Sequence, residues 1–202
     1  RLAQRKRRDA FMQAGLEMGF NPESAILPAT EEELKVLPLF TNRGAQFNNV
    51  LLGYALGGEA MLLDFAYKAG KHSISQTLAA FRWSESSLPH FQLAPEHFLH
   101  RLAEAFGYRE IDLESHPEFS RRYWLRGNDE SAVQAFFTPH MVAFFEHLEK
   151  GKEWTVESGG RYLVIYRPGR KVDASDLRAF LEETSTVASA LRRAAAKGTF
   201  GY

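Results

Sequence analysis

The chain has 202 residues, of which 45% are hydrophobic and 25% charged, a composition typical of a folded globular domain and not of a disordered segment. Its 25 Lys and Arg residues balance 25 Asp and Glu residues, so no overall charge indicates a nucleic-acid ligand. The sequence contains no Cys, which excludes disulfides, thiolate metal sites and cysteine nucleophiles. Its apolar runs fall short of the roughly 20 residues that a membrane-spanning helix needs.

The first predicted element is a helix over residues 1–20, an N-terminal arm to a single domain over residues 21–202. A basic block precedes the first acidic residue of this helix and consists of Arg1, Arg5, Lys6, Arg7 and Arg8. One interpretation is an ordinary solvated helix end. The other is a membrane-proximal stretch that follows an anchor upstream of Arg1 and lies on the cytoplasmic side, where anionic lipids attract it.

A short helix over residues 30–37 is expected next, with the Thr30 hydroxyl as its cap. Residues 47–83 then predict a meander of three antiparallel strands. Gly57-Gly58 and Gly70 are expected to supply the positive φ angles of its two turns.

The remaining elements follow in chain order: a short strand at 91–93, a helix at 95–107, a strand at 119–126, a helix from 128 or 129 to about 137, a helix from Pro139, a hairpin at 155–167 and a long helix from 173 to 198. The strands cluster instead of alternating with helices. The predicted class is therefore α+β, with a largely antiparallel sheet of about five to seven strands, helices packed on one face and a long C-terminal helix.

Candidate chemistry is sparse. His97 and His100 share a helix face with Glu96 and Glu104, but a solvated helix surface explains this stripe, and no His-Glu-x-x-His pattern is present. The acidic residues around His116 are interpreted as an ordinary loop. Nucleophile-elbow and P-loop patterns are also missing, so we predict no catalytic residue, no metal ligand and no cofactor.

Arginines provide the most distinctive surface signal, in two groups on the predicted strand 119–126 and after the late hairpin: Arg121, Arg122, Arg126, Arg167 and Arg170. Adjacent strands would bring these guanidinium groups together as an anion-binding or partner-binding patch for phosphate or lipid headgroups. The alternative is that they pair with the nearby carboxylates of Asp129, Glu130 and Glu157. Because the total charge is neutral, a nucleic-acid partner is not expected.

The segment His116-Pro-Glu-Phe-Ser-Arg-Arg-Tyr-Trp-Leu-Arg, followed by Phe137-Thr-Pro, resembles a family of uncharacterised bacterial membrane-anchored proteins with a domain of unknown function. Leu37-Pro-Leu-Phe, Gln76-Thr77 and Tyr166-Arg-Pro-Gly-Arg are similar to other signposts of that family, although residues 66–73 depart from its longer, more polar hairpin. The resemblance implies an N-terminal transmembrane helix followed by basic residues. It implies no activity, substrate or catalytic residue.

We therefore expect a non-catalytic binding or scaffolding domain, tethered at the cytoplasmic face of a membrane, whose partner is an anionic membrane surface or a protein. The alternative function is a hydrolase-type enzyme whose site is not recognisable from sequence, and the alternative location is the cytoplasm. A deep pocket with clustered His and carboxylate groups would favour the enzyme, and an apolar or arginine-rich patch would favour binding.

Overall fold

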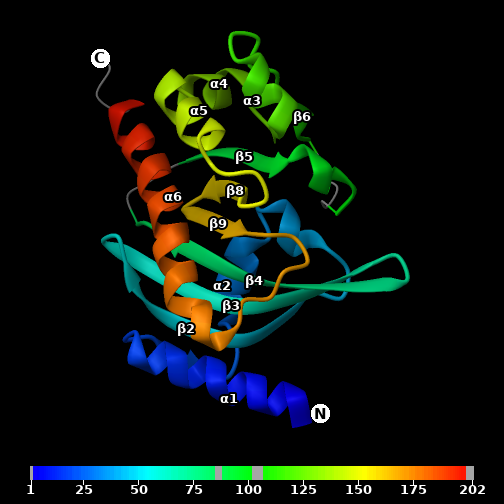
Figure 1. Cartoon of the computed structure of the whole chain (residues 1–202), viewed down its shortest axis with the longest axis vertical. Coiled ribbons are helices and arrows are strands. Elements are labelled where there is room, and N and C mark those ends of the chain that lie inside the picture. Colours follow the sequence, from blue (N-terminus) through cyan, green and yellow to red (C-terminus); the bar gives the residue numbers. More distant parts are fainter. Residues whose placement is uncertain (1, 85–87, 102–106, 199–202) are drawn as a thin grey trace.

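The computed structural model describes residues 2–84, 88–101 and 107–198, and within these ranges nine strands form a single sheet in which every neighbouring pair is antiparallel (Figure 1). The strand order is β1-β2-β3-β4-β9-β8-β5-β7-β6. The strands are β1 (Asn21–Glu23), β2 (Gln46–Ala55), β3 (Gly58–Ala69), β4 (His72–Arg82), β5 (Leu88–Pro95), β6 (Arg109–Glu110), β7 (Tyr123–Gly127), β8 (Thr155–Gly160) and β9 (Tyr162–Tyr166).

Helices connect and cover these strands. The α-helices are α1 (Leu2–Glu17), α2 (Pro28–Leu34), α3 (Pro117–Arg122), α4 (Glu130–Phe136), α5 (Pro139–Glu146) and α6 (Leu177–Gly198). Three short 3₁₀ helices are η1 (Pro38–Thr41), η2 (Glu96–Arg101) and η3 (Ala174–Asp176). Among the described residues, no helix is both long and apolar enough to cross a membrane.

Helices lie on both faces of the sheet, which corrects the prediction of a single covered face. Leu62 of β3 packs in a core with α1, α4, α5 and α6, whereas its neighbour Leu63 packs in a second core with α2 and η1. Figure 1 shows α6 crossing one side of the sheet and α2 behind it. Because β3, β4 and β9 carry consecutive buried residues, both of their faces have to be removed from water.

The α+β class, the antiparallel sheet and the long C-terminal helix are confirmed. The predicted count of about five to seven strands was too low, because the edge strands β1 and β6 have only three and two residues. Such short segments show no periodicity in the sequence. The Gly70 turn is also confirmed, with a φ angle of 61°.

Several local predictions were wrong. Pro117 occupies the first turn of α3, so the predicted strand at 119–126 is a helix as far as Arg122 and a strand only from Tyr123. The β2–β3 turn uses Leu56 and Gly57, with φ angles of 56° and 69°, in place of Gly57-Gly58. Thr30 lies inside α2, which begins at Pro28.

The helix predicted at 95–107 is the 3₁₀ helix η2 over its first residues, and its part at 102–106 lies outside the described residues, as do the side chains of His100 and Glu104.

Candidate functional site

The sheet order separates the two arginine groups. Strand β7 carries Arg126, and Arg167 follows β9, but β5 and β8 lie between these two strands. Arg121 and Arg122 end the helix α3, and Arg170 lies on the exposed loop after β9. The structure therefore does not bring the five arginines together on adjacent strands, which was the condition for a single patch.

Three of these arginines are engaged inside the protein. Arg122 donates hydrogen bonds to the backbone carbonyls of Glu146 and Leu148 at the end of α5 and to the Glu153 carboxylate, 3.2 Å away. This places a cation at the negative end of a helix.

The Arg167 guanidinium lies 3.4 Å from the centroid of the Trp154 ring and donates to the Glu183 carboxylate at 3.3 Å. Arg126 belongs to a buried polar row described next. Arg121 is exposed and pairs with Glu118.

The buried row runs across three neighbouring strands. Arg126 of β7, Gln92 of β5 and Glu157 of β8 are register partners. Arg126 Nε donates to Gln92 Oε1 at 2.7 Å, and Gln92 Nε2 donates to Glu157 Oε1 at 2.5 Å. Two further donors reach the same carboxylate: Tyr166 Oη at 2.8 Å and the backbone amide of Leu39 at 2.9 Å. The row joins the sheet to η1 on the face that α2 covers.

Burial raises the pKa of Glu157 above its ordinary value of 4.5, because an ionised carboxylate loses its hydration there. The donors Leu39, Tyr166 and Gln92 and the charge of Arg126 act in the opposite direction. Glu157 is completely buried, so these contacts satisfy it within the protein, and the row holds the fold together.

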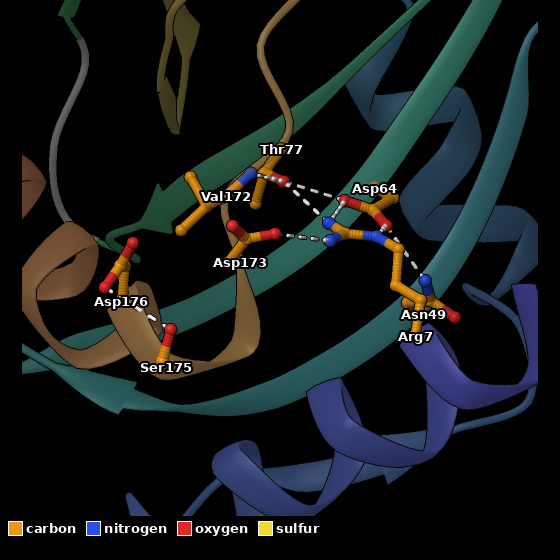
Figure 2. A network of polar contacts seen from close by, with 8 residues as sticks. All are labelled: Arg7, Asn49, Asp64, Thr77, Val172, Asp173, Ser175 and Asp176. Carbon is orange, nitrogen blue, oxygen red and sulfur yellow. Dashed lines mark hydrogen bonds and ion pairs between the residues drawn. The ribbon is translucent and has the colours of Figure 1, made fainter. Parts of the chain in front are cut away.

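A second polar network attaches α1 to the sheet (Figure 2). Arg7 of α1 donates from Nε and Nη2 to the two carboxylate oxygens of Asp64 on β3, at 2.8 Å each. Thr77, the register partner of Asp64 on β4, donates its hydroxyl to the same carboxylate at 2.7 Å. Asn49 Nδ2 donates to it at 2.9 Å. We call these four residues the Arg7–Asp64 latch.

Local backbone geometry explains how Asn49 reaches the latch. The pairing of β2 with β3 shifts between Asn48 and Leu51, and Asn49 adopts a positive φ angle of 52° at this bulge. Asn tolerates this left-handed conformation better than most residues, and a bulge changes the direction of a side chain.

The latch also fixes the loop after β9. The backbone amide of Val172 donates to the Thr77 hydroxyl at 2.9 Å, and the Thr77 amide donates to the Arg170 carbonyl at 2.9 Å. The Gly169 amide donates to Gln76 Oε1 at 2.9 Å. Figure 2 shows the Arg7 side chain extending from α1 toward Asp64 and Thr77, with Val172 of this loop beside Thr77.

Asp64 is ionised in this setting. Burial opposes ionisation, but the hydrogen bonds from Arg7, Thr77 and Asn49 and the charge of Arg7 outweigh it and hold the pKa of Asp64 below its ordinary 3.8. The same contacts raise the pKa of Arg7, chiefly through its hydrogen bonds to Asp64. The latch is therefore a charged pair at neutral pH.

The rest of the basic block stays at the surface. Arg5, Lys6 and Arg8 are exposed, and Asp9 lies 4.0 Å from Arg5 and 3.7 Å from Arg8. Arg1 lies outside the described residues. A cavity of about 500 Å³ opens beside the latch, between the start of α1, the ends of β2, β3 and β4, and Lys171 of the loop after β9. In the part of the chain that the structure describes, no three His, Asp or Glu side chains gather as metal ligands would.

Sequence reasoning missed Asp64 and Thr77 as organising residues, and it named Glu157 only as an alternative partner of the surface arginines. The available signal was a carboxylate inside an apolar strand, as in Met61-Leu-Leu-Asp-Phe, because such a residue is buried only when it is paired. Helical spacing places Arg7 on the same face as Phe11 and Gly15, but Arg8 stands three residues before Phe11, so the sequence does not choose between the two.

No protein-family model and no curated protein sequence matches the chain. Among solved structures, the chain is similar to the crystal structure of the mycobacterial trehalose monomycolate transport factor A, TtfA, with a TM-score of 0.64 and 14% sequence identity. The match covers 96% of this chain and 97% of that chain, so it extends over the whole architecture. At this identity the likeness shows a shared fold.

Proposed function

We propose that this chain is a non-catalytic binding or scaffolding domain tethered at the cytoplasmic face of a membrane. The observation that carries the proposal is how the protein uses its charged groups. The buried carboxylates of Asp64 and Glu157 are satisfied in hydrogen-bonded networks, while the open polar cavity beside the Arg7–Asp64 latch is lined mainly by basic residues. A surface of this kind recognises a ligand through charge and hydrogen bonds.

The fold likeness supports the same class of role. TtfA is by name a transport factor for trehalose monomycolate. A domain of the same fold in this chain fits an auxiliary binding role. The resemblance of residues 116–130 to membrane-anchored proteins supports an anchor upstream of Arg1.

Cell fractionation tests the tether. The natural protein, including whatever precedes Arg1, should sediment with membranes and stay there after a high-salt wash, because salt screens surface charge but does not extract an apolar anchor. Residues 1–202 expressed alone should leave the membrane fraction in the same wash. Recovery of the natural protein in the soluble fraction at every salt concentration would contradict the proposed tether.

A further inference from the structure

The ionisable residues that line the cavity beside the Arg7–Asp64 latch are mainly basic. They are Arg5, Arg7, Arg8 and Lys171, with Asp64 as the sole carboxylate on the described lining. Arg7 and Asp64 neutralise each other through their two-point contact. Outside the lining, Asp173 lies 4.0 Å from Arg7, and the exposed Asp9 balances part of the charge of Arg5 and Arg8. With Lys171, these arginines still give the lining an excess of positive charge. An anionic ligand would be attracted to this space.

Neutral donors complete the lining. Asn48 of β2 and Ser73 and Ser75 of β4 line the cavity, and within the described chain their side chains form no hydrogen bond to the protein. Hydroxyl and amide groups suit the hydroxyls of a polyol, whereas arginine forks suit phosphate oxygens. The volume of about 500 Å³ is in the range of small-molecule sites.

Three residues of the Arg7–Asp64 latch, Arg7, Asn49 and Asp64, line this cavity, and the packing of α1 on the sheet holds Arg7 in place. Phe11 of α1 is fully buried in the core, and an ideal Cβ on Gly15 would lie 2.5 Å from Leu51, so α1 approaches the sheet closely. Arg7 then fixes the first turns of the helix on Asp64. Arg5 and Arg8 stand on either side of Arg7 in sequence and reach the cavity from a docked helix.

We propose that this cavity binds the phosphate ester of a polyol, held by Arg5, Arg8 and Lys171 at the phosphate and by Asn48, Ser73 and Ser75 at the hydroxyls. The assignment rests on the proposed binding function and names its ligand class. The same chemistry occurs in a free polyol phosphate and in a phospholipid headgroup. The N-terminal end of α1, which carries the cavity, lies at the margin of the molecule in Figure 1, where either source has access.

Titration calorimetry with glycerol 3-phosphate, at low salt on residues 1–202, tests the free ester. Saturable binding is expected, and Arg8→Gln or Lys171→Gln should each weaken it roughly tenfold, the size of one lost charge-assisted contact. Lys6→Gln is the matched control, since Lys6 is exposed on the same helix but does not line the cavity. The affinity of the Lys6→Gln variant for glycerol 3-phosphate should stay within about twofold of the parent value. Thermal melts confirm that each variant remains folded.

Vesicle flotation tests the lipid source with the same variants. Preference for phosphatidylglycerol over phosphatidylcholine vesicles, lost in Arg8→Gln but kept in Lys6→Gln, identifies the headgroup as a ligand. Binding of glycerol 3-phosphate without vesicle binding identifies a free ester instead. The assignment is overturned when neither probe binds, or when Lys6→Gln weakens binding as much as Arg8→Gln. Fractionation of the natural protein tests the membrane anchor and does not test this cavity. The proposed tether and the proposed ligand site can therefore fail independently.

Discussion

Replacement of Glu157 by alanine is expected to lower the free energy of unfolding by about 4 kcal/mol, a large part of the total stability of roughly 5–15 kcal/mol of a typical domain. The change removes the acceptor of three donors: the Leu39 amide, the Gln92 amide and the Tyr166 hydroxyl. Each buried donor left without an acceptor costs about 1–3 kcal/mol, and the truncated side chain leaves a void. Arg126 also loses its favourable charge interaction with Glu157.

Urea unfolding of the parent protein, Glu157→Ala and Glu157→Gln measures this effect. The glutamine variant keeps the shape and one acceptor oxygen, so it should fall between the other two. A loss of less than about 1 kcal/mol in Glu157→Ala would show that water replaces the carboxylate and that the row is not a closed network.

Replacement of Asp64 by alanine is expected to cost about 3 kcal/mol, because removing one partner of a buried ion pair leaves the other charge uncompensated. Arg7, Thr77 and Asn49 lose their common acceptor. The Arg7 side chain is 21% exposed, so water reaches its guanidinium and keeps the loss at the lower end of the range for buried pairs. The control is Glu59→Ala on the same strand, whose ion pair with Arg82 is exposed and should contribute less than about 1 kcal/mol.

The loss of stability in Asp64→Ala is expected to depend on pH. Because the folded protein holds the pKa of Asp64 below 3.8, its contribution to stability is complete above that pH and declines as the pH falls through the folded-state pKa. The difference between the parent protein and Asp64→Ala should therefore shrink in acid. A difference that stays constant on acidification would contradict the charged latch. The pH dependence expected for Glu157 has the opposite sign. Because the folded protein raises the pKa of Glu157 above 4.5, the stability that this group contributes is complete below pH 4.5 and is lost as the pH rises through the folded-state pKa.

The sequence predicted the features of the fold that local chemistry determines. The start of α4 is an example: a helix was predicted from residue 128 or 129, and the structure has Asp129 as its cap, whose carboxylate accepts from the Ala132 amide at 3.0 Å. Gly70 occupies its turn with a positive φ angle, and the long C-terminal helix predicted at 173–198 is α6, which begins at Leu177. Such signals depend on neighbours along the chain.

Features that depend on strand order were not predictable in the same way. Arg126 and Arg167 were expected to meet if their strands were adjacent, but β5, which comes earlier in the sequence, lies between β7 and β8. Likewise, Arg7 pairs with Asp64, 57 residues away, and the register of α1 on the sheet selects it from a block of similar side chains. The long-range packing of Phe11 and Gly15 contributes to that register.

A docked α1 is the condition for the basic cavity, and amide hydrogen exchange tests it most directly. The amides of residues 11–15 should exchange at least about a hundredfold more slowly than in an unstructured chain, because opening them requires separating Phe11 from the core and breaking the Arg7–Asp64 latch. In Asp64→Ala, α1 should lose this protection before β3 and β4 do. Unprotected exchange throughout α1, while β3 and β4 remain protected in the parent protein, would show that the basic block is a free arm and that the cavity does not exist in solution.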